Sequence, residues 1–158
     1  MKKIDAEHLS GYEPIDSKIV KIKYDDVRFA PRKAHPDDAC YDCFAAASKE
    51  IPPSYRCKMP LGFRLEIPRW FEGLIRPRSG LALKHGITVL NSPGTIDSGY
   101  RGEVCAILIN LGDRSYKINE GDRICQLAIR KIDYFSVVEA QELRDSDRGD
   151  GGFGSTGR

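Results

Sequence analysis

Apolar and polar residues alternate with a period of two in several stretches of the chain. Val20, Ile22 and Tyr24 alternate with lysines, and the stretch from Leu61 to Ile67 repeats the pattern. Successive side chains of a strand point to opposite faces of a sheet. This period therefore predicts half-buried antiparallel strands in both stretches.

Continuous apolar runs form a second kind of pattern. They cover residues 87–90, 104–109 and 124–129. Short apolar runs bounded by turn residues are typical of strands that are buried on both faces. Residues 41–45 and 135–138 are predicted as two further strands.

Turn residues separate these stretches at short intervals, as at Pro52-Pro53, Asn91–Gly94 and Asn119–Asp122. The only helix that the pattern predicts is one or two turns around residues 81–85. Many short strands with this spacing predict an all-β fold, either a sandwich, a jelly roll or a barrel.

Composition narrows the classes of function. The chain has 158 residues, which is enough for one domain with a core of its own. The net charge of +2 argues against nucleic-acid binding, although one or two arginines suffice to bind a small anion. No apolar stretch is long enough for a signal peptide or a membrane span. The odd number of five cysteines favours free thiols in a reducing cytoplasm.

Cys40 and Cys43 form a C-x-x-C pair. A structural zinc site needs four ligands, and the sequence has neither a second such pair nor a spaced pair of histidines. Cysteine is also a common small core residue. We therefore do not predict a zinc site.

The composition changes after Arg144, where the sequence reads RDSDRGDGGFGSTGR and five of the last ten residues are glycine. A frayed end is the commoner fate of such a segment, because it cannot offset its own ordering entropy. Among the glycines, however, stand a cation, an aromatic ring and two hydroxyls: Arg148, Phe153, Ser155 and Thr156. A lid over a ligand with phosphates and a ring uses these groups. We expect residues 1–143 to form the domain and residues 144–158 a mobile lid.

Polar residues also interrupt the apolar pattern at a few places. Arg78, Ser79 and Gly80 precede the predicted helix, and a helix start with an arginine and a hydroxyl favours phosphate, although plain surface turns use the same residues. Asp97 directly follows the apolar Ile96 and is either a turn cap, the commoner case, or a functional acid.

Gln126 and Asp42 are two further polar residues in predicted strands. Gln126 is a single amide in an apolar run, so it must be paired by the protein, a ligand or water. Asp42 is an ordinary strand-end acid or a ligand. The sequence offers no protein cage for a metal, which suits Mg²⁺ because that ion usually arrives with phosphates and keeps its waters.

Five segments along the chain, in this order, resemble the five motifs of the trimeric dUTPase family. They are APRKAHPDDACYDCFAA, RPRSGLALKHG, NSPGTIDSGYRGE, GDRICQL and RGDGGFGSTG. The resemblance implies a jelly-roll-like β-barrel or sandwich that hydrolyses dUTP to dUMP and pyrophosphate. It assigns to Asp97 the activation of the water that attacks the α-phosphorus.

The resemblance also implies how the substrate is bound. Asn91, the backbone of Gly94, Thr95 and Ile96, and the return strand near Cys105 would read the uracil edge. Tyr100 would pack on the deoxyribose and exclude a 2′-hydroxyl. The phosphates would be bound by Arg78, Ser79, Gly80 and Gln126. In the tail, Arg148 would contact the γ-phosphate, Phe153 would stack on uracil, and Gly154, Ser155 and Thr156 would complete the terminal phosphate site.

The same resemblance implies a cofactor and an assembly. Mg²⁺ would accompany the triphosphate, and Asp42 would contact this ion through water. Members of the family are homotrimers in which each active site takes residues from three chains. Their product dUMP supplies thymidylate synthesis while the level of dUTP falls.

The chain departs from the family pattern at four positions. Cys40 and Cys43 stand where glycine and leucine are usual, Leu61 where threonine is common, and Trp70 where glycine is usual. We expect these four to be packing or turn positions that change local geometry rather than activity.

Two alternative functions stay in view. A dCTP deaminase shares the fold and the segment IDSGYRGE, but it needs a glutamate ten residues beyond the aspartate, where this chain has Ile107. A nucleotide-sensing protein that keeps the dUTPase fold is the second alternative. The intact motif set argues for catalysis and leaves room for an added regulatory role.

Overall fold

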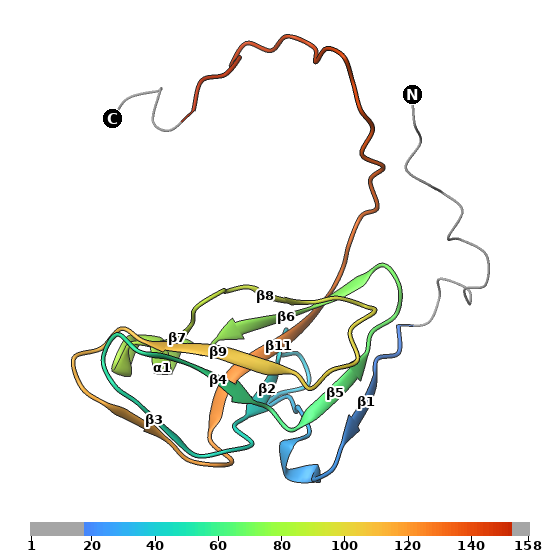
Figure 1. Ribbon diagram of the computed structural model, residues 1–158. Helices are drawn as coiled ribbons and strands as arrows, with labels where there is room; N and C mark the ends of the chain where they lie inside the picture. Colours follow the sequence, from blue (N-terminus) through green and yellow to red (C-terminus); the bar gives the residue numbers. More distant parts are fainter. Residues whose placement is uncertain (1–17, 153–158) are drawn as a thin grey trace. The chain divides into compact units, whose positions relative to one another are not determined.

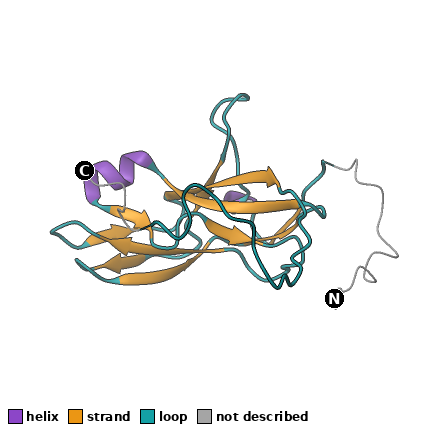
Figure 2. Ribbon diagram, turned by 90° about the horizontal axis from the view of Figure 1, so that it is seen from above, coloured by secondary structure: helices purple, strands orange, loops and turns teal. Residues whose placement is uncertain are grey.

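The computed structural model describes residues 18–152 and divides the chain into two units. The described part of the body is residues 18–134, and the described part of the second unit is residues 135–152. The two units are described separately. Figure 1 shows that strands make up most of the body, and Figure 2 shows the same body coloured by secondary structure.

The body contains eleven short strands and two short helical segments within the described residues. The strands are β1 (Lys21–Tyr24), β2 (Tyr41–Phe44), β3 (Lys49–Ile51), β4 (Arg56–Pro60), β5 (Phe63–Glu66), β6 (Phe71–Pro77), β7 (Ile87–Val89), β8 (Gly94–Ile96), β9 (Cys105–Asn110), β10 (Tyr116–Ile118) and β11 (Arg123–Lys131). The helical segments are the 3₁₀ turn η2 (Val27–Phe29) and the helix α1 (Ser79–His85). The predicted all-β class is confirmed.

Every strand pair in the described residues is antiparallel. The largest sheet has the order β2-β11-β6-β8, and a second sheet has the order β4-β9-β7. Two smaller sheets pair β1 with β5 and β3 with β10. One apolar cluster contains side chains from both larger sheets, including Cys43, Ile75, Met59 and Leu108. The two larger sheets therefore share one core.

The alternating and apolar stretches predicted most of the long strands. β1, β2, β5, β7, β9 and β11 lie where the pattern places them. The helix predicted around residues 81–85 is α1, which begins two residues earlier than expected. Within residues 18–152, no helix has the length and apolar character that crossing a membrane demands.

Three strand predictions need correction. Residues 87–90 are not buried on both faces, because Thr88 is partly accessible and Leu90, which follows β7, is 47% exposed. Residues 104–109 are not buried on both faces, because β9 alternates buried and accessible positions and Ile107 is 39% exposed. The sheet that contains β9 packs one face on the core, so an apolar run did not require cover on the other face. Residues 135–138 form no strand. Phe135 and Val137 are 78% and 82% exposed, since the described chain gives this segment no strand to pair with.

Candidate active site

Asp42 is the centre of a polar cluster on the largest sheet. It lies on β2, and its side chain is almost fully buried. Its Oδ1 accepts a hydrogen bond from Gln126 Nε2 at 3.2 Å and pairs with Arg78 Nε at 3.5 Å. Its Oδ2 accepts a hydrogen bond from Arg123 Nη1 at 3.1 Å. The structure thus brings together three residues that the sequence assigned to phosphates and metal.

Arg123 is the member of this cluster that the sequence analysis missed. It begins β11, and its backbone oxygen accepts a hydrogen bond from Arg78 Nη1 at 2.9 Å. The signal was present, because a cation at the start of an apolar strand lies inside the segment GDRICQL. Two guanidinium groups face the Asp42 carboxylate, so the cluster keeps an excess of one positive charge. Such an excess favours an anionic ligand.

The start of α1 adjoins this cluster. Arg78 is the N-cap residue and makes no side-chain cap, while Ser79 and Gly80 form the exposed first turn. The first backbone N–H groups of a helix have no partner within the helix. A Cβ atom added at Gly80 would meet nothing within 4 Å, so the space above this turn is open. The arrangement suits a phosphate, as the sequence predicts.

β8 presents a free backbone edge at the other end of the same sheet. It is the outermost strand, pairing with β6 on one side and with no strand of the described chain on the other. Gly94 and Ile96 are buried, whereas Thr95 is exposed. A strand edge of this kind offers N–H and C=O groups to a planar ligand edge.

The side-chain amide of Asn91 lies close to the backbone at the start of β8. A Cβ atom added at Gly94 would lie 3.2 Å from Asn91 Nδ2 and 3.5 Å from its Oδ1. A glycine at position 94 therefore lets the amide approach the backbone of β8. Two of the residues assigned to the uracil base, Asn91 and Gly94, are thus brought together.

Asp97 follows β8 directly and is exposed. Its backbone oxygen accepts a hydrogen bond from Tyr100 N at 3.0 Å, which closes the turn behind it. Among the described residues, its carboxylate has no hydrogen-bond or ion-pair partner. Asp97 is thus no side-chain turn cap in this structure, and its carboxylate is available as a proton acceptor.

Tyr100 and Cys105 complete the segment after Asp97. Tyr100 is 45% exposed, its hydroxyl donates to Glu103 O at 3.0 Å, and its ring covers Gly102, where a Cβ atom would lie 2.9 Å from the ring atom Cε2. Cys105 is half-buried, and its Sγ lies 3.6 Å from Glu103 O. Burial raises the pKa of the Cys105 thiol, so this group stays protonated.

Asp97 and the phosphate cluster lie far apart within one chain. Ile96 is opposite Gly73 on β6, whereas Arg78 lies five positions further along the chain. At about 3.3 Å per residue, Arg78 is therefore roughly 16 Å from the level of Ile96. Gln126 is opposite Arg76, which is three positions from Gly73 and therefore roughly 10 Å away. Within one chain, the structure therefore does not bring Asp97, the predicted general base, close to the predicted phosphate-binding residues.

The predicted lid is only partly described. Arg148 lies in the described part of the second unit, where its Nε donates to Gly151 O at 2.7 Å. Arg148 lies within a turn that Gly149 N closes by donating to Ser146 O at 3.0 Å. Four predicted residues lie outside the described residues: Phe153, Gly154, Ser155 and Thr156.

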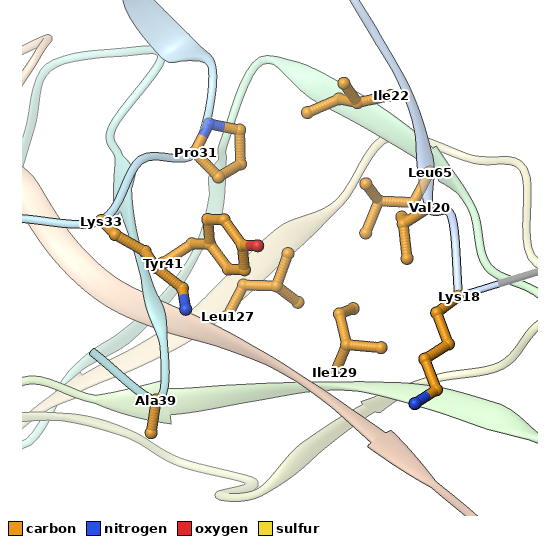
Figure 3. A pocket seen from close by; sticks show the side chains of 10 residues that line it. All are labelled: Lys18, Val20, Ile22, Pro31, Lys33, Ala39, Tyr41, Leu65, Leu127 and Ile129. Carbon is orange, nitrogen blue, oxygen red and sulfur yellow. The ribbon is translucent and has the colours of Figure 1, made fainter. Parts of the chain in front are cut away.

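A separate hollow lies between β1, β5, β2 and β11. Apolar side chains form its walls, and Lys18 and Lys33 stand at its rim (Figure 3). Tyr41 and Leu127 line it and are register partners next to Asp42 and Gln126. None of the predicted site residues lines this hollow, so it is separate from the predicted substrate site.

The described residues hold no group of three or more histidines, cysteines and acids that could bind a metal. The Asp42 carboxylate already faces three donors, so at most it has one acceptor position left. This donor set fits contact with a hydrated Mg²⁺ that other ligands hold, and it does not fit a cage built by the protein.

The four departures are packing or turn positions, as expected. Cys43 and Leu61 are fully buried in the core, and Cys40 is half-buried in a bend. Trp70 lies in the turn before β6 with a φ of 70°, a left-handed conformation that glycine adopts more readily. Its ring contacts Tyr134 edge to face at 4.8 Å and lies under the Arg69 guanidinium at 4.4 Å.

Comparison with known proteins supplies the family. The family model dUTPase matches residues 28–157. The chain is 49% identical over 143 residues to the deoxyuridine 5'-triphosphate nucleotidohydrolase of Clostridium acetobutylicum, covering 90% of this chain and 97% of that protein. It is 47% identical over 140 residues to the protein of the same name from Gloeothece citriformis, covering 89% and 97%.

Solved structures agree with these relatives. A mutant dUTPase of Staphylococcus bacteriophage 80alpha with dUpNHpp superposes with a TM-score of 0.80 at 26% identity, covering 90% of this chain and all of that chain. A mutant dUTPase from phage phi11 of S. aureus, whose structure reveals the coordination of a structural Mg(II) ion, gives a TM-score of 0.73 at 23% identity over 80% of this chain. The predicted jelly-roll fold is confirmed.

Proposed function

The chain belongs to the dUTPase family and is a dUTP diphosphatase; from that premise we propose that Asp97 is the general base of the reaction. In this proposal, water attacks the α-phosphorus of dUTP and releases dUMP and pyrophosphate. The observation that carries it is the free edge of β8, which ends directly at Asp97. A nucleobase held along this edge would direct its sugar and α-phosphate toward the carboxylate.

Recognition of the base rests on backbone groups of β8 and on the amide of Asn91. The backbone of Gly94, Thr95 and Ile96 would pair with the uracil edge, and Cys105 on the returning strand would complete the contact. Backbone donors and acceptors in a rigid strand fit uracil and mismatch cytosine at its exocyclic amine. A site with buried polar groups rejects the wrong pattern strongly, because those groups would be left unpaired.

Tyr100 would select the sugar. Its ring is held by the hydroxyl contact with Glu103 O at 3.0 Å and by the lack of a side chain at Gly102. A fixed aromatic face beside the ribose packs against a C2′ methylene and clashes with a 2′-hydroxyl. We therefore assign to Tyr100 the preference for deoxyribose.

The phosphates would bind to the Asp42 cluster and the start of α1. Arg78 supplies charge, Ser79 and Gly80 supply backbone N–H groups and a hydroxyl, and Gln126 supplies an amide. Asp42 would hold Arg78 and Gln126 in place and contact hydrated Mg²⁺ with its remaining acceptor position. When bound, Mg²⁺ supplies charge neutralisation for the phosphate oxygens during in-line displacement.

Proton transfer falls to Asp97. Its carboxylate is exposed and has no partner among the described residues, so it can accept a hydrogen bond from a water molecule. The attacking water would give its proton to Asp97 as its oxygen bonds to the α-phosphorus and the bond to pyrophosphate breaks. Arg78 of the phosphate cluster would offset the negative charge of the leaving pyrophosphate.

Assembly follows from the distance between these parts. Roughly 16 Å along β6 separates Arg78 from the level of Ile96, the residue before Asp97 in the same chain, and this exceeds the span of a triphosphate. We propose that the base and sugar are held by one chain and the phosphates by a neighbouring chain of a homotrimer. The glycine-rich tail, residues 144–158, would close each site with Arg148 on the γ-phosphate and Phe153 on uracil.

The cellular role follows from the chemistry. Hydrolysis of dUTP lowers the level of a nucleotide that resembles dTTP and supplies dUMP for thymidylate synthesis. Free cysteines favour a reducing compartment such as the cytoplasm. Nucleic acid and membranes are not expected partners.

The test is release of pyrophosphate from dUTP, dCTP, dTTP and UTP, measured side by side with and without Mg²⁺. We expect fast, Mg²⁺-dependent hydrolysis of dUTP and little turnover of the other three. Ammonia is measured in the same samples, because its release from dCTP would identify a deaminase. Comparable turnover of dCTP or UTP would contradict the proposed roles of β8 and Tyr100.

A further inference from the structure

Two cysteines without a part in the proposed reaction lie opposite each other in the largest sheet. Cys43 on β2 and Cys125 on β11 are register partners, and both side chains are fully buried. A side-chain hydrogen bond with Cys125 raises the pKa of the Cys43 thiol well above its ordinary value, and burial adds to the rise. Cys43 therefore stays protonated while the sheet is closed, with Cys125 directly opposite it on the neighbouring strand.

The register of these residues meets the geometry of a disulfide. Directly opposed residues of an antiparallel pair have Cα atoms about 4.5–5.5 Å apart. A disulfide needs Cα atoms about 4.4–6.8 Å apart. All five cysteines are free in this structure, so the pair is in its reduced state.

Local structure gives an oxidant a route to the pair. β2 is the outermost strand of its sheet, and on its outer side the described chain adds only an isolated bridge between Arg32 and Asp42. The pairing of β11 with β2 shifts register between Arg123 and Cys125, next to the thiol. An edge strand with an interrupted ladder opens at a lower free energy than the rest of a core.

We infer that Cys43 and Cys125 are a redox-modification site, at which a hydroperoxide forms a cross-strand disulfide that slows dUTP hydrolysis. In the opened edge, one thiolate attacks hydrogen peroxide and becomes a sulfenic acid, with release of the first water after protonation. The second thiol displaces the sulfenic hydroxyl as the second water and forms the S–S bond. Two thiols lose two electrons and two protons, and one peroxide is reduced to two waters.

The consequence for turnover follows from the neighbouring residues. Asp42 precedes Cys43, Gln126 follows Cys125, and their side chains form a hydrogen bond of 3.2 Å. An S–S bond of about 2.05 Å is much shorter than the contact between two thiols. Closing it draws the two side chains together within a packed core, and the neighbouring Asp42–Gln126 hydrogen bond must adjust to the new packing. The inference goes beyond the proposed function, and only its activity arm depends on dUTP hydrolysis.

The test uses the full chain with hydrogen peroxide as the probe. After treatment, the protein is unfolded without reductant and alkylated with iodoacetamide. Mass spectrometry of the intact chain then gives the number of alkyl groups. The reduced protein carries five alkyl groups, one for each of its five cysteines, and we expect three after oxidation. A tryptic map should then show a cross-link between Cys43 and Cys125. Turnover of dUTP should fall at least fivefold and recover with dithiothreitol.

Matched variants separate this pair from the other thiols. Cys43→Ala and Cys125→Ala should form no cross-link and should keep their own starting activity under peroxide. Cys40→Ala, at the half-buried member of the C-x-x-C pair, should still form the cross-link. Circular dichroism shows whether each variant is folded. A Cys40–Cys43 cross-link, five alkyl groups after treatment, or a Cys43–Cys125 cross-link with unchanged turnover would overturn the inference.

Discussion

At the scale of single residues, the carboxylate of Asp97 stands out because it is exposed and has no partner among the described residues. Asp97→Asn keeps its shape and removes the proton acceptor. We expect kcat to fall roughly 10²–10⁴-fold, the usual contribution of a general base, with affinity for a non-hydrolysable dUTP analogue largely kept. Steady-state kinetics and calorimetric titration measure the two quantities. Asp113→Asn, at another exposed loop aspartate, is the control and should leave both unchanged.

The contact between Asn91 and Gly94 gives a second prediction at this scale. Gly94→Ala places a Cβ atom 3.2 Å from Asn91 Nδ2, so the amide must shift by a few tenths of an ångström. We expect affinity for the dUTP analogue to fall roughly tenfold, about 1.4 kcal/mol, with a smaller change in kcat.

Gly99→Ala is the matched control for this change. Gly99 lies in the turn that follows β8, and its added Cβ atom meets nothing within 4 Å. Normal affinity in this variant would assign the loss at position 94 to the displaced amide. Equal losses of affinity in both variants would mean that neither position tolerates a side chain, and this would remove the argument for Asn91.

Sequence and structure agree unevenly on these residues. The motif pattern places Asp42, Arg78 and Gln126 in one site, and the structure joins them through Asp42. The motif pattern does not reveal that Arg123 pairs with the same Asp42 carboxylate. A side-chain contact between residues 81 positions apart depends on the register of β2 and β11. Periodicity shows where a strand runs but carries no information on its partner.

At the scale of elements, the turn between β4 and β5 depends on Gly62. Its φ is 73°, and an added Cβ atom would lie 2.8 Å from Phe29 Cγ. We expect Gly62→Ala to lower the free energy of unfolding by about 2–4 kcal/mol, since left-handed strain and overpacking act together. Gly121→Ala has the same kind of φ, 87°, in open space, and should cost only about 1 kcal/mol. Denaturant unfolding compares the two, and equal losses would exclude a packing role for Phe29.

The elements that the sequence predicts are those with a strong period or a continuous apolar run, such as β5 and β11. β6 escapes notice because Glu72, Gly73 and Arg76 break its apolar pattern, although it pairs with β11 along seven register positions. β8 has three residues, which is too short for a period. Residues 135–138 show the opposite error: an apolar pattern indicates strand propensity, but a strand also needs a neighbour.

At the scale of the whole molecule, the proposal requires residues from different chains in each site. We expect a homotrimer, with a mass by light scattering three times the 17.7 kDa of one chain. This measurement alone leaves open whether sites are shared. The roughly 16 Å between Arg78 and the level of Ile96, next to Asp97, makes a sharper experiment possible.

Complementation between two inactive variants tests the shared site directly. Asp97→Asn removes the base, and Arg78→Gln removes the phosphate cation, so each pure variant should be nearly inactive. In trimers reassembled from equal amounts of both, a site is intact when the chain that gives Asp97 is the Arg78→Gln variant and its neighbour is the Asp97→Asn variant. Each condition holds for half of the chains, so about a quarter of the sites should be intact.

Because a single arginine or base contributes orders of magnitude to turnover, these sites would dominate the rate. We expect about a quarter of wild-type activity in the mixture. If one chain supplied both residues, no hybrid could hold an intact site, and the mixture would be as inactive as its components.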